Sequence, residues 1–183
     1  MRIFLIITLF FTALLADRDG GPYLGIGYGT AEYSNSDYYD SIAESSSKAM
    51  SLYAGAYINK HLSVEVGYAE FGSSDKGFSV EKSSSLSNLS FTAFTFSVLG
   101  HYAFFNDVLD TYVRLGAGEI REDELSLKGF SEEYGVGIGV RFNKWLSMKV
   151  AYDMYRFKYE EPVSAVKYGM SIDYMYAALE VQF

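Results

Sequence analysis

The chain has 183 residues, a formal net charge of −8 at pH 7 and no cysteine. This length fits one domain of ordinary size, the acidic charge disfavours a nucleic-acid partner, and the lack of cysteine excludes disulfides and thiolate metal sites. Aromatic residues make up 17% of the chain, and its only prolines are Pro22 and Pro162, a composition that is typical of β-strands.

The N-terminal residues have the pattern of a signal peptide. The basic Arg2 precedes an apolar run over residues 3–15, which is shorter than the roughly 20 residues that a helix needs to span a bilayer. A small residue suited to cleavage, Ala16, ends the run. The sequence therefore predicts a cleaved signal peptide over residues 1–16 and a mature domain over 17–183, with an uncleaved membrane anchor as the alternative.

From Tyr23 onward, apolar and polar residues alternate over segments that are separated by polar connections. Most of these segments are close to the length of about 9–11 residues that a tilted strand needs to cross a membrane. We expect eight strands, over residues 22–33, 49–58, 62–71, 90–105, 111–120, 130–142, 145–156 and 168–183.

The connections between the expected strands alternate between long and short. The first, third, fifth and seventh are long, as in residues 34–48 and 72–89, whereas the others are short, as in 59–61 and 143–144. In outer-membrane barrels, tight turns face the periplasm and long loops face outward. A sandwich or a soluble barrel has no reason to sort its connections in this way. The sequence therefore predicts an all-β fold, an eight-stranded antiparallel up-and-down transmembrane β-barrel.

Aromatic residues on the apolar faces collect near both ends of the expected strands. Those near the short connections are Tyr102, Phe104, Phe142 and Phe183, and those near the long connections are Tyr68, Phe94, Tyr134 and Tyr152. Two belts of rings suit the two interfaces of a bilayer, so we expect the apolar faces to contact lipid. The alternative is a lipocalin-like soluble binding barrel, in which these faces point inward to a ligand.

The segment over residues 49–58 is ambiguous, because both of its faces are apolar. We favour the aliphatic face as the one that contacts lipid, over the face that carries Tyr53 and Tyr57. The aliphatic residues are Met50, Leu52, Ala54, Ala56 and Ile58.

The chain ends in an alternating segment whose last residue is Phe183. Its apolar face, Met175, Ala177, Leu179, Val181 and Phe183, looks like the terminal signal by which outer-membrane barrels are recognised for assembly. Residues 58–68 also nearly repeat as residues 142–152, each copy being a tight turn followed by a strand.

Together these features resemble the OmpA/OmpX-like outer-membrane β-barrel family. The resemblance implies a location in the outer membrane of a Gram-negative bacterium, contact with the barrel assembly machinery, and a barrel without the periplasmic peptidoglycan-binding domain of OmpA-type proteins.

The polar faces place charged residues of both signs in the narrow interior of the expected barrel. We expect a lumen network of Glu65, His101, Arg114, Glu133, Arg141, Lys149, Asp153 and Glu180. Counted from the short connections, Lys149 lies at the depth of Glu180 on the adjacent strand, and Arg114 at the depth of Glu65 across the interior. Such pairs would close the lumen, because eight strands leave just enough room for side chains. The functional alternative is a gated or proton-conducting network.

The sequence offers no clear catalytic, cofactor or metal site. Acyl chemistry in a lipid-modifying barrel usually needs a histidine beside a hydroxyl at the outer rim, whereas His61 and His101 both lie towards the short connections. Two carboxylate pairs, Asp37 with Asp40 and Glu122 with Asp123, are expected to be solvated loop residues, with cation binding or acid–base chemistry as the alternative. The alternate glycines of residues 25–29 and 135–139 are expected to face the lumen and relieve crowding.

Basic residues in or beside the long connections would lie level with lipopolysaccharide phosphates. The possible contacts are Lys48, Lys76, Lys82, Arg121, Lys128, Arg156, Lys158 and Lys167. The sequence therefore favours a non-enzymatic barrel with a role in envelope integrity or in adhesin-like contact with host or surface ligands through its loops. A small porin-like channel and a lipid-modifying enzyme are the alternatives.

Overall fold

The computed structural model describes residues 20–35, 45–72, 90–105, 108–122, 127–160 and 167–183. The predicted signal peptide lies outside these residues. No helix in the described part of the chain is long and apolar enough to cross a membrane. The described residues form eight strands, which are β1 (Gly21–Asn35), β2 (Ser45–Asn59), β3 (Leu62–Phe71), β4 (Phe91–Phe104), β5 (Leu109–Glu122), β6 (Leu127–Arg141), β7 (Leu146–Glu160) and β8 (Lys167–Gln182).

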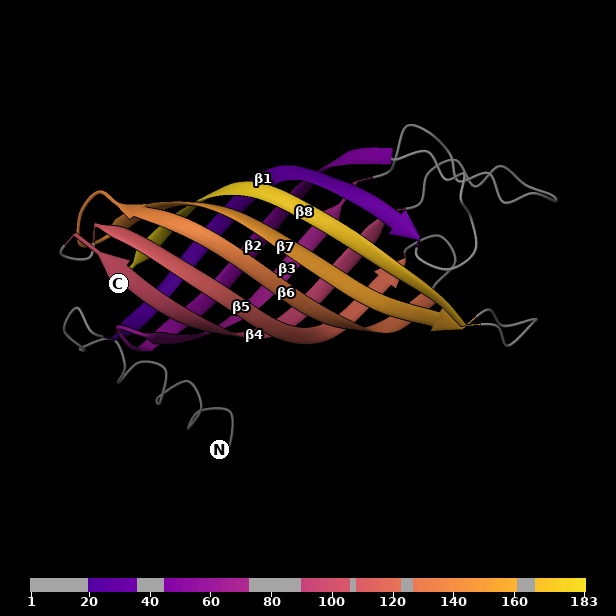
Figure 1. The fold of residues 1–183 in the computed structure, drawn as a ribbon, viewed down its shortest axis with the longest axis horizontal. Helices are drawn as coiled ribbons and strands as arrows, with labels where there is room; N and C mark the ends of the chain where they lie inside the picture. Colours follow the sequence, from indigo (N-terminus) through magenta and orange to yellow (C-terminus); the bar gives the residue numbers. More distant parts are fainter. Residues whose placement is uncertain (1–19, 36–44, 73–89, 106–107, 123–126, 161–166) are drawn as a thin grey trace, which may run out of the picture.

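The strands close into a barrel in which each one pairs antiparallel with its neighbours in sequence (Figure 1). The first and last strands complete the ring, with a register that runs from Tyr23 opposite Gln182 to Asn35 opposite Met170. Figure 1 shows the odd-numbered strands ending at one end of the barrel, and the even-numbered strands and the C-terminus at the other. The predicted eight-stranded up-and-down barrel is confirmed.

Several strands extend beyond their predicted ends, mainly towards the long connections. Strand β2 begins at Ser45 instead of residue 49, and β7 continues to Glu160 instead of residue 156. These added residues are mostly polar or charged. The backbone ladder continues there, but the apolar alternation stops, because side chains beyond the hydrocarbon no longer need to be apolar.

The two faces of the sheet differ as predicted, with apolar side chains outside and polar or aromatic side chains inside. Strand β2 shows this most clearly, since Met50 and Leu52 are 48% and 51% exposed whereas Tyr53 is 4% exposed. The interpretation of the aliphatic face of β2 as the outer one is therefore confirmed. The eight rings of the two predicted aromatic belts also face outward. The apolar face of the terminal segment, including Phe183, is exposed as well.

The half of the interior nearer the long connections is filled by aromatic side chains. The ring centroid of Phe71 lies 5.1 Å from that of Tyr155 and 5.7 Å from that of Tyr174. Phe91, the cross-strand partner of Phe71 on β4, lies with its ring centroid 5.8 Å from that of Tyr33 and 5.7 Å from that of Phe157. We call these six residues the aromatic layer. They come from β1, β3, β4, β7 and β8, and all are buried.

Glycines on the inner face make room for large side chains from neighbouring strands. A Cβ atom at Gly25 would overlap the ring of Tyr53, and one at Gly137 would overlap the ring of Tyr112. The interior of an eight-stranded barrel is barely wide enough for its side chains, so these rings fit only where the facing residue has no side chain. The alternate glycines therefore help to set the shape of the polar interior.

Candidate functional site

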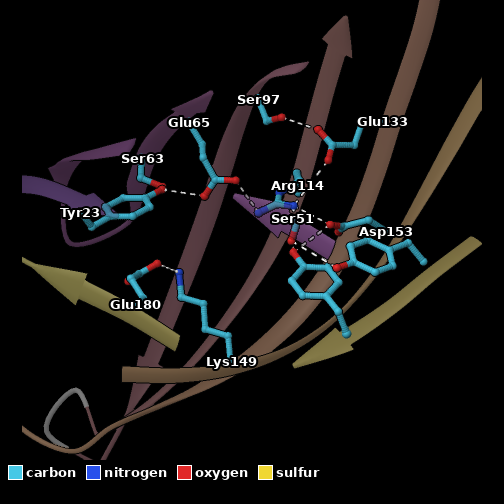
Figure 2. A network of polar contacts seen from close by, with 12 residues as sticks. Tyr23, Ser51, Ser63, Glu65, Ser97, Arg114, Glu133, Lys149, Asp153 and Glu180 are labelled. Atoms are coloured by element: carbon cyan, nitrogen blue, oxygen red, sulfur yellow. Dashed lines mark hydrogen bonds and ion pairs between the residues drawn. The ribbon is translucent and has the colours of Figure 1, made fainter. Parts of the chain in front are cut away.

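The middle of the lumen is organised around one arginine on β5. Arg114 is 5% exposed, and its guanidinium binds carboxylates from three other strands (Figure 2). Its Nη2 lies 2.6 Å from Oε1 of Glu65 on β3, and its Nη1 lies 2.5 Å from Oδ2 of Asp153 on β7. Nη1 is also 3.4 Å from Oε1 of Glu133 on β6. A planar guanidinium has five donors, which is why one arginine can serve three acceptors.

Hydroxyl groups supply further hydrogen-bond donors to these carboxylates. Tyr176 donates to Oδ2 of Asp153 at 2.9 Å, and Tyr23 donates to Oε2 of Glu65 at 3.1 Å. Ser97 donates to Glu133. Buried carboxylates need hydrogen-bond donors or counter-ions to be tolerated, so these hydroxyls are part of the same structural unit. We call Arg114, its three carboxylates and these hydroxyls the arginine cluster.

A second ion pair lies beside the arginine cluster. Lys149 on β7 donates to Glu180 on β8, and both side chains are buried. The Lys149 ammonium also lies over three rings, at 5.1 Å from the centroid of Tyr23, 5.8 Å from Tyr53 and 5.3 Å from Tyr112. Aromatic faces attract a desolvated cation, so the rings hold the ammonium in place together with the carboxylate.

Charge at the centre of the barrel is not balanced by ion pairing alone. The two groups contain four carboxylates, from Glu65, Glu133, Asp153 and Glu180, and two cations, from Arg114 and Lys149. Hydroxyl donors compensate, as in the contact of 3.4 Å from Tyr57 to Glu180. The arrangement is consequently an interlocked network of ion pairs and hydrogen bonds across the middle of the lumen.

His101 belongs to a third group, at the end of the lumen near the short turns. Its Nδ1 lies 2.8 Å from Oδ2 of Asp110, and its Nε2 lies 2.8 Å from Oγ of Ser63. The order hydroxyl, imidazole, carboxylate is that of a nucleophilic triad. However, Ser63 is fully buried, and the rings of Tyr57 and Tyr112 pack on the imidazole at 5.1 and 5.7 Å. A substrate carbonyl has no route to Ser63 in this conformation.

The structure brings together six of the eight residues expected in the lumen network. Arg114 with Glu65 and Lys149 with Glu180 are the two pairs expected from the sequence. Glu133 and Asp153 join Arg114, whereas His101 turns to Asp110. Arg141 is half-buried near the short-turn end and contacts none of the other seven through a hydrogen bond or ion pair.

Sequence reasoning missed Asp110 and most of the inward tyrosines. Asp110 was assigned to the short connection before residue 111, but β5 begins at Leu109. The inward face of β2 that carries Tyr53 and Tyr57 was predicted, but these rings were not expected to take part in the lumen network. Tyr174 and Tyr176 on β8 also point inward and were not assigned to the lumen. Their spacing of two or four residues, opposite in phase to aliphatic neighbours, was the available signal.

The predicted solvated carboxylate pairs need one correction. Glu122 is 4% exposed at the end of β5, so its assignment to a solvated loop was wrong. The strand continues two residues further than expected, and its alternation turns this side chain inward. Asp37, Asp40 and Asp123 lie outside the described residues. Among the described residues, no group of three or more acidic or histidine side chains is arranged to hold a metal ion.

The basic residues expected near lipopolysaccharide lie at several places. Lys48, Arg121, Lys128, Arg156 and Lys158 are exposed near the ends of β2, β5, β6 and β7 that border the long connections. Lys76 and Lys82 lie outside the described residues. Lys167 is the first residue of β8, but its side chain is not described.

A closed eight-stranded barrel with an apolar, ring-belted exterior and a filled polar interior defines an outer-membrane β-barrel protein. The chain matches the model of the family described as outer membrane protein beta-barrel domain over residues 3–181. It therefore belongs to this family and is a protein of the Gram-negative outer membrane. A search of curated protein sequences gave no significant match.

Solved structures with the same fold include three outer-membrane barrels. Neisserial surface protein A (NspA) is 16% identical with a TM-score of 0.63, and the alignment covers 89% of this chain and 97% of NspA. Ail from Yersinia pestis, in complex with the heparin analogue sucrose octasulfate, is 15% identical with a TM-score of 0.54, over 90% and 99% of the two chains. OprG from Pseudomonas aeruginosa is 14% identical with a TM-score of 0.53, over 90% and 97%.

Proposed function

We propose that the protein works without catalysis, as a closed outer-membrane barrel that contributes to envelope integrity and contacts surface ligands through its outer connections. The observation that carries this proposal is the filled interior. The arginine cluster occupies the middle of the lumen, and the aromatic layer occupies the half above it. A barrel whose described interior is filled by side chains acts through its surfaces.

Two further observations support a non-catalytic role. Ser63 carries the hydroxyl that contacts His101, and it is buried at the end of the barrel opposite the long connections. A lipid-modifying barrel would need such a group in reach of lipid at the outer rim. Ail, a barrel of the same fold, was crystallised with a heparin analogue, and this supports surface contact with a ligand as a use of the fold.

Planar-bilayer recording tests the closed interior. The purified chain is expected to give no discrete conductance steps. A general porin, recorded in parallel as the positive control, should give them. Reproducible conductance steps in the wild type, with a different conductance in an Arg114→Ala variant, would establish the small-channel alternative instead.

A deletion strain tests the role in the envelope. We expect greater sensitivity to detergent or weaker adhesion, restored by the wild-type chain, with an unchanged mass spectrum of lipid A. A lipid A species that changes with the deletion and returns with the wild-type chain would contradict a non-enzymatic role.

Signal-peptide cleavage after Ala16 and recognition of the terminal strand by the assembly machinery belong to the same proposal. N-terminal sequencing of the protein from outer membranes is expected to begin at Asp17. Deletion of Phe183, an exposed residue at the end of the chain, is expected to reduce the amount of assembled barrel.

A further inference from the structure

Charge is distributed unevenly around the outer rim of the barrel, on the face that points away from the lumen. On β5, β6 and β7, the described outward positions near the long connections hold four basic residues, Arg121, Lys128, Arg156 and Lys158, and two acidic ones, Glu119 and Glu132. On β8, β1, β2 and β3, the corresponding positions hold one basic residue, Lys48, and three acidic ones, Glu32, Glu70 and Asp173. One side of the rim is therefore basic.

Backbone pairing brings the basic side chains together. Arg121 on β5 lies directly opposite Lys128 on β6, so their Cβ atoms are about 5 Å apart. Lys158 on β7 runs beside Gly129, the next residue of β6, where a Cβ would lie 3.1 Å from the Lys158 carbonyl oxygen. Arg156 lies two residues before Lys158 on β7, directly opposite Glu132 of β6, and its guanidinium is 5.9 Å from the ring centroid of Tyr134. We call these four residues the rim cluster.

An apolar hollow lies on the same outer face, nearer the middle of the barrel. Val136 and Ile138 of β6, Val150 and Tyr152 of β7 and Met175 of β8 line it. Tyr152 precedes Arg156 by four residues on one strand, which is about 13 Å. The hollow and the rim cluster therefore lie one above the other, within the length of a single lipid molecule.

We propose that the rim cluster binds the phosphate groups of lipopolysaccharide while one of its acyl chains occupies the hollow. Lysine and arginine bind phosphate oxygens through charge-assisted hydrogen bonds. The cluster covers three strands, about 10 Å at the usual strand spacing, which suits a glycolipid that carries more than one phosphate. This inference deepens the envelope-integrity part of the proposed function and rests on it.

A matched pair of variants tests the site. Lys128→Gln with Lys158→Gln removes two exposed lysines from the rim cluster, and Lys60→Gln with Lys144→Gln removes two exposed lysines from the short turns at the other end. Each full-length variant is purified from outer membranes in mild detergent, and its bound lipopolysaccharide is measured as 3-hydroxy fatty acid per protein. We expect a loss of about tenfold or more in the rim variant, since each cation near an anionic surface strengthens binding about fivefold. The turn variant should match the wild type.

Equal lipopolysaccharide content in the rim variant and the wild type would overturn the proposal. Thermal unfolding of the wild type with added lipopolysaccharide or phosphatidylglycerol distinguishes the two sources of phosphate. Stabilisation by phosphatidylglycerol as large as that by lipopolysaccharide would assign the site to phospholipid and would also overturn it. Heat-dependent mobility on gels verifies that each variant folds. If the double variant does not fold, Lys128→Gln and Lys158→Gln are each compared with Lys144→Gln. Channel activity of the wild type would refute the proposed function, but the comparison of lipopolysaccharide content between the rim and turn variants would still stand.

Discussion

Arg114 shows what a single residue contributes to this barrel. It is buried among Glu65, Glu133 and Asp153, so removing its charge leaves these carboxylates buried without their counter-ion. Arg121, seven residues further along β5, pairs with Glu119 at the surface, where its side chain is 57% exposed. The two arginines therefore provide a matched comparison of a buried and a solvated ion pair.

Replacement of Arg114 by Met is expected to lower the free energy of unfolding by about 3–5 kcal/mol, the usual result of leaving a buried partner unpaired. Arg121→Met should change it by less than about 1 kcal/mol, because a solvated pair contributes little. Urea titration of the barrel in lipid vesicles, followed by tryptophan fluorescence, measures both. Similar losses in the two variants would contradict the central role of the arginine cluster.

The triad of Ser63, His101 and Asp110 has catalytic geometry without catalytic access. We expect a fluorophosphonate probe to leave Ser63 unlabelled in the folded barrel, since its side chain is fully buried. Intact mass spectrometry after incubation provides the measurement, with a serine hydrolase as the positive control. Stoichiometric labelling that a Ser63→Ala variant abolishes would show an opening of the lumen and would revive the enzymatic alternative.

Single residues also mark the limit of prediction from sequence. Depth counted from the short turns placed Lys149 near Glu180 because adjacent strands share one simple register. The convergence of Glu133 and Asp153 on Arg114 depends on strand tilt and on the direction of long side chains across the lumen. Neither is encoded in the alternation of polar and apolar residues, so the composition of the cluster emerged only from the structure.

At the scale of the strands, the sequence specified the central portions and left the ends open. Lipid requires an apolar outer face, so residues such as Val64, Val98 and Val150 alternate strictly with inward neighbours. Beyond the hydrocarbon this requirement disappears. The first residues of β2 are consequently polar on both faces, and they read as loop although their backbone pairs with β1.

Glycine placement within strands can be tested by a matched substitution. A Cβ at Gly137 on β6 would overlap the ring of Tyr112, whereas at Gly100 on β4 the nearest atom, Cγ2 of Val113, is 3.6 Å away. Gly137→Ala is expected to destabilise the barrel by about 1–3 kcal/mol through overpacking. Gly100→Ala should be neutral or stabilising by up to about 1 kcal/mol, because it restricts the unfolded chain.

Urea unfolding in vesicles and the folded fraction on unheated gels provide the measurements for the two glycines. Tyr112→Ala should relieve much of the defect of Gly137→Ala, since it removes the clashing ring. Equal tolerance of alanine at the two positions would show that the lumen can expand to admit extra atoms.

At the scale of the whole molecule, this barrel differs from a soluble one in that its apolar side chains lie outside and its charged side chains lie inside. Its exposed side chains are apolar and its buried centre holds four carboxylates and two cations, which is stable only if hydrocarbon surrounds the outside. Water around the same surface would leave large aromatic and aliphatic residues solvated on every strand.

The absence of cysteine makes this orientation directly measurable. Nitroxide labels on single cysteines at Val64, Val98 and Val150, in barrels reconstituted in bilayers, are expected to collide more often with oxygen than with a water-soluble nickel chelate, because oxygen concentrates in hydrocarbon. A label at Lys144, in the exposed turn between β6 and β7, should show the reverse preference. Low accessibility to both quenchers at the three valines would mean that they face protein, and the barrel would then be inside out.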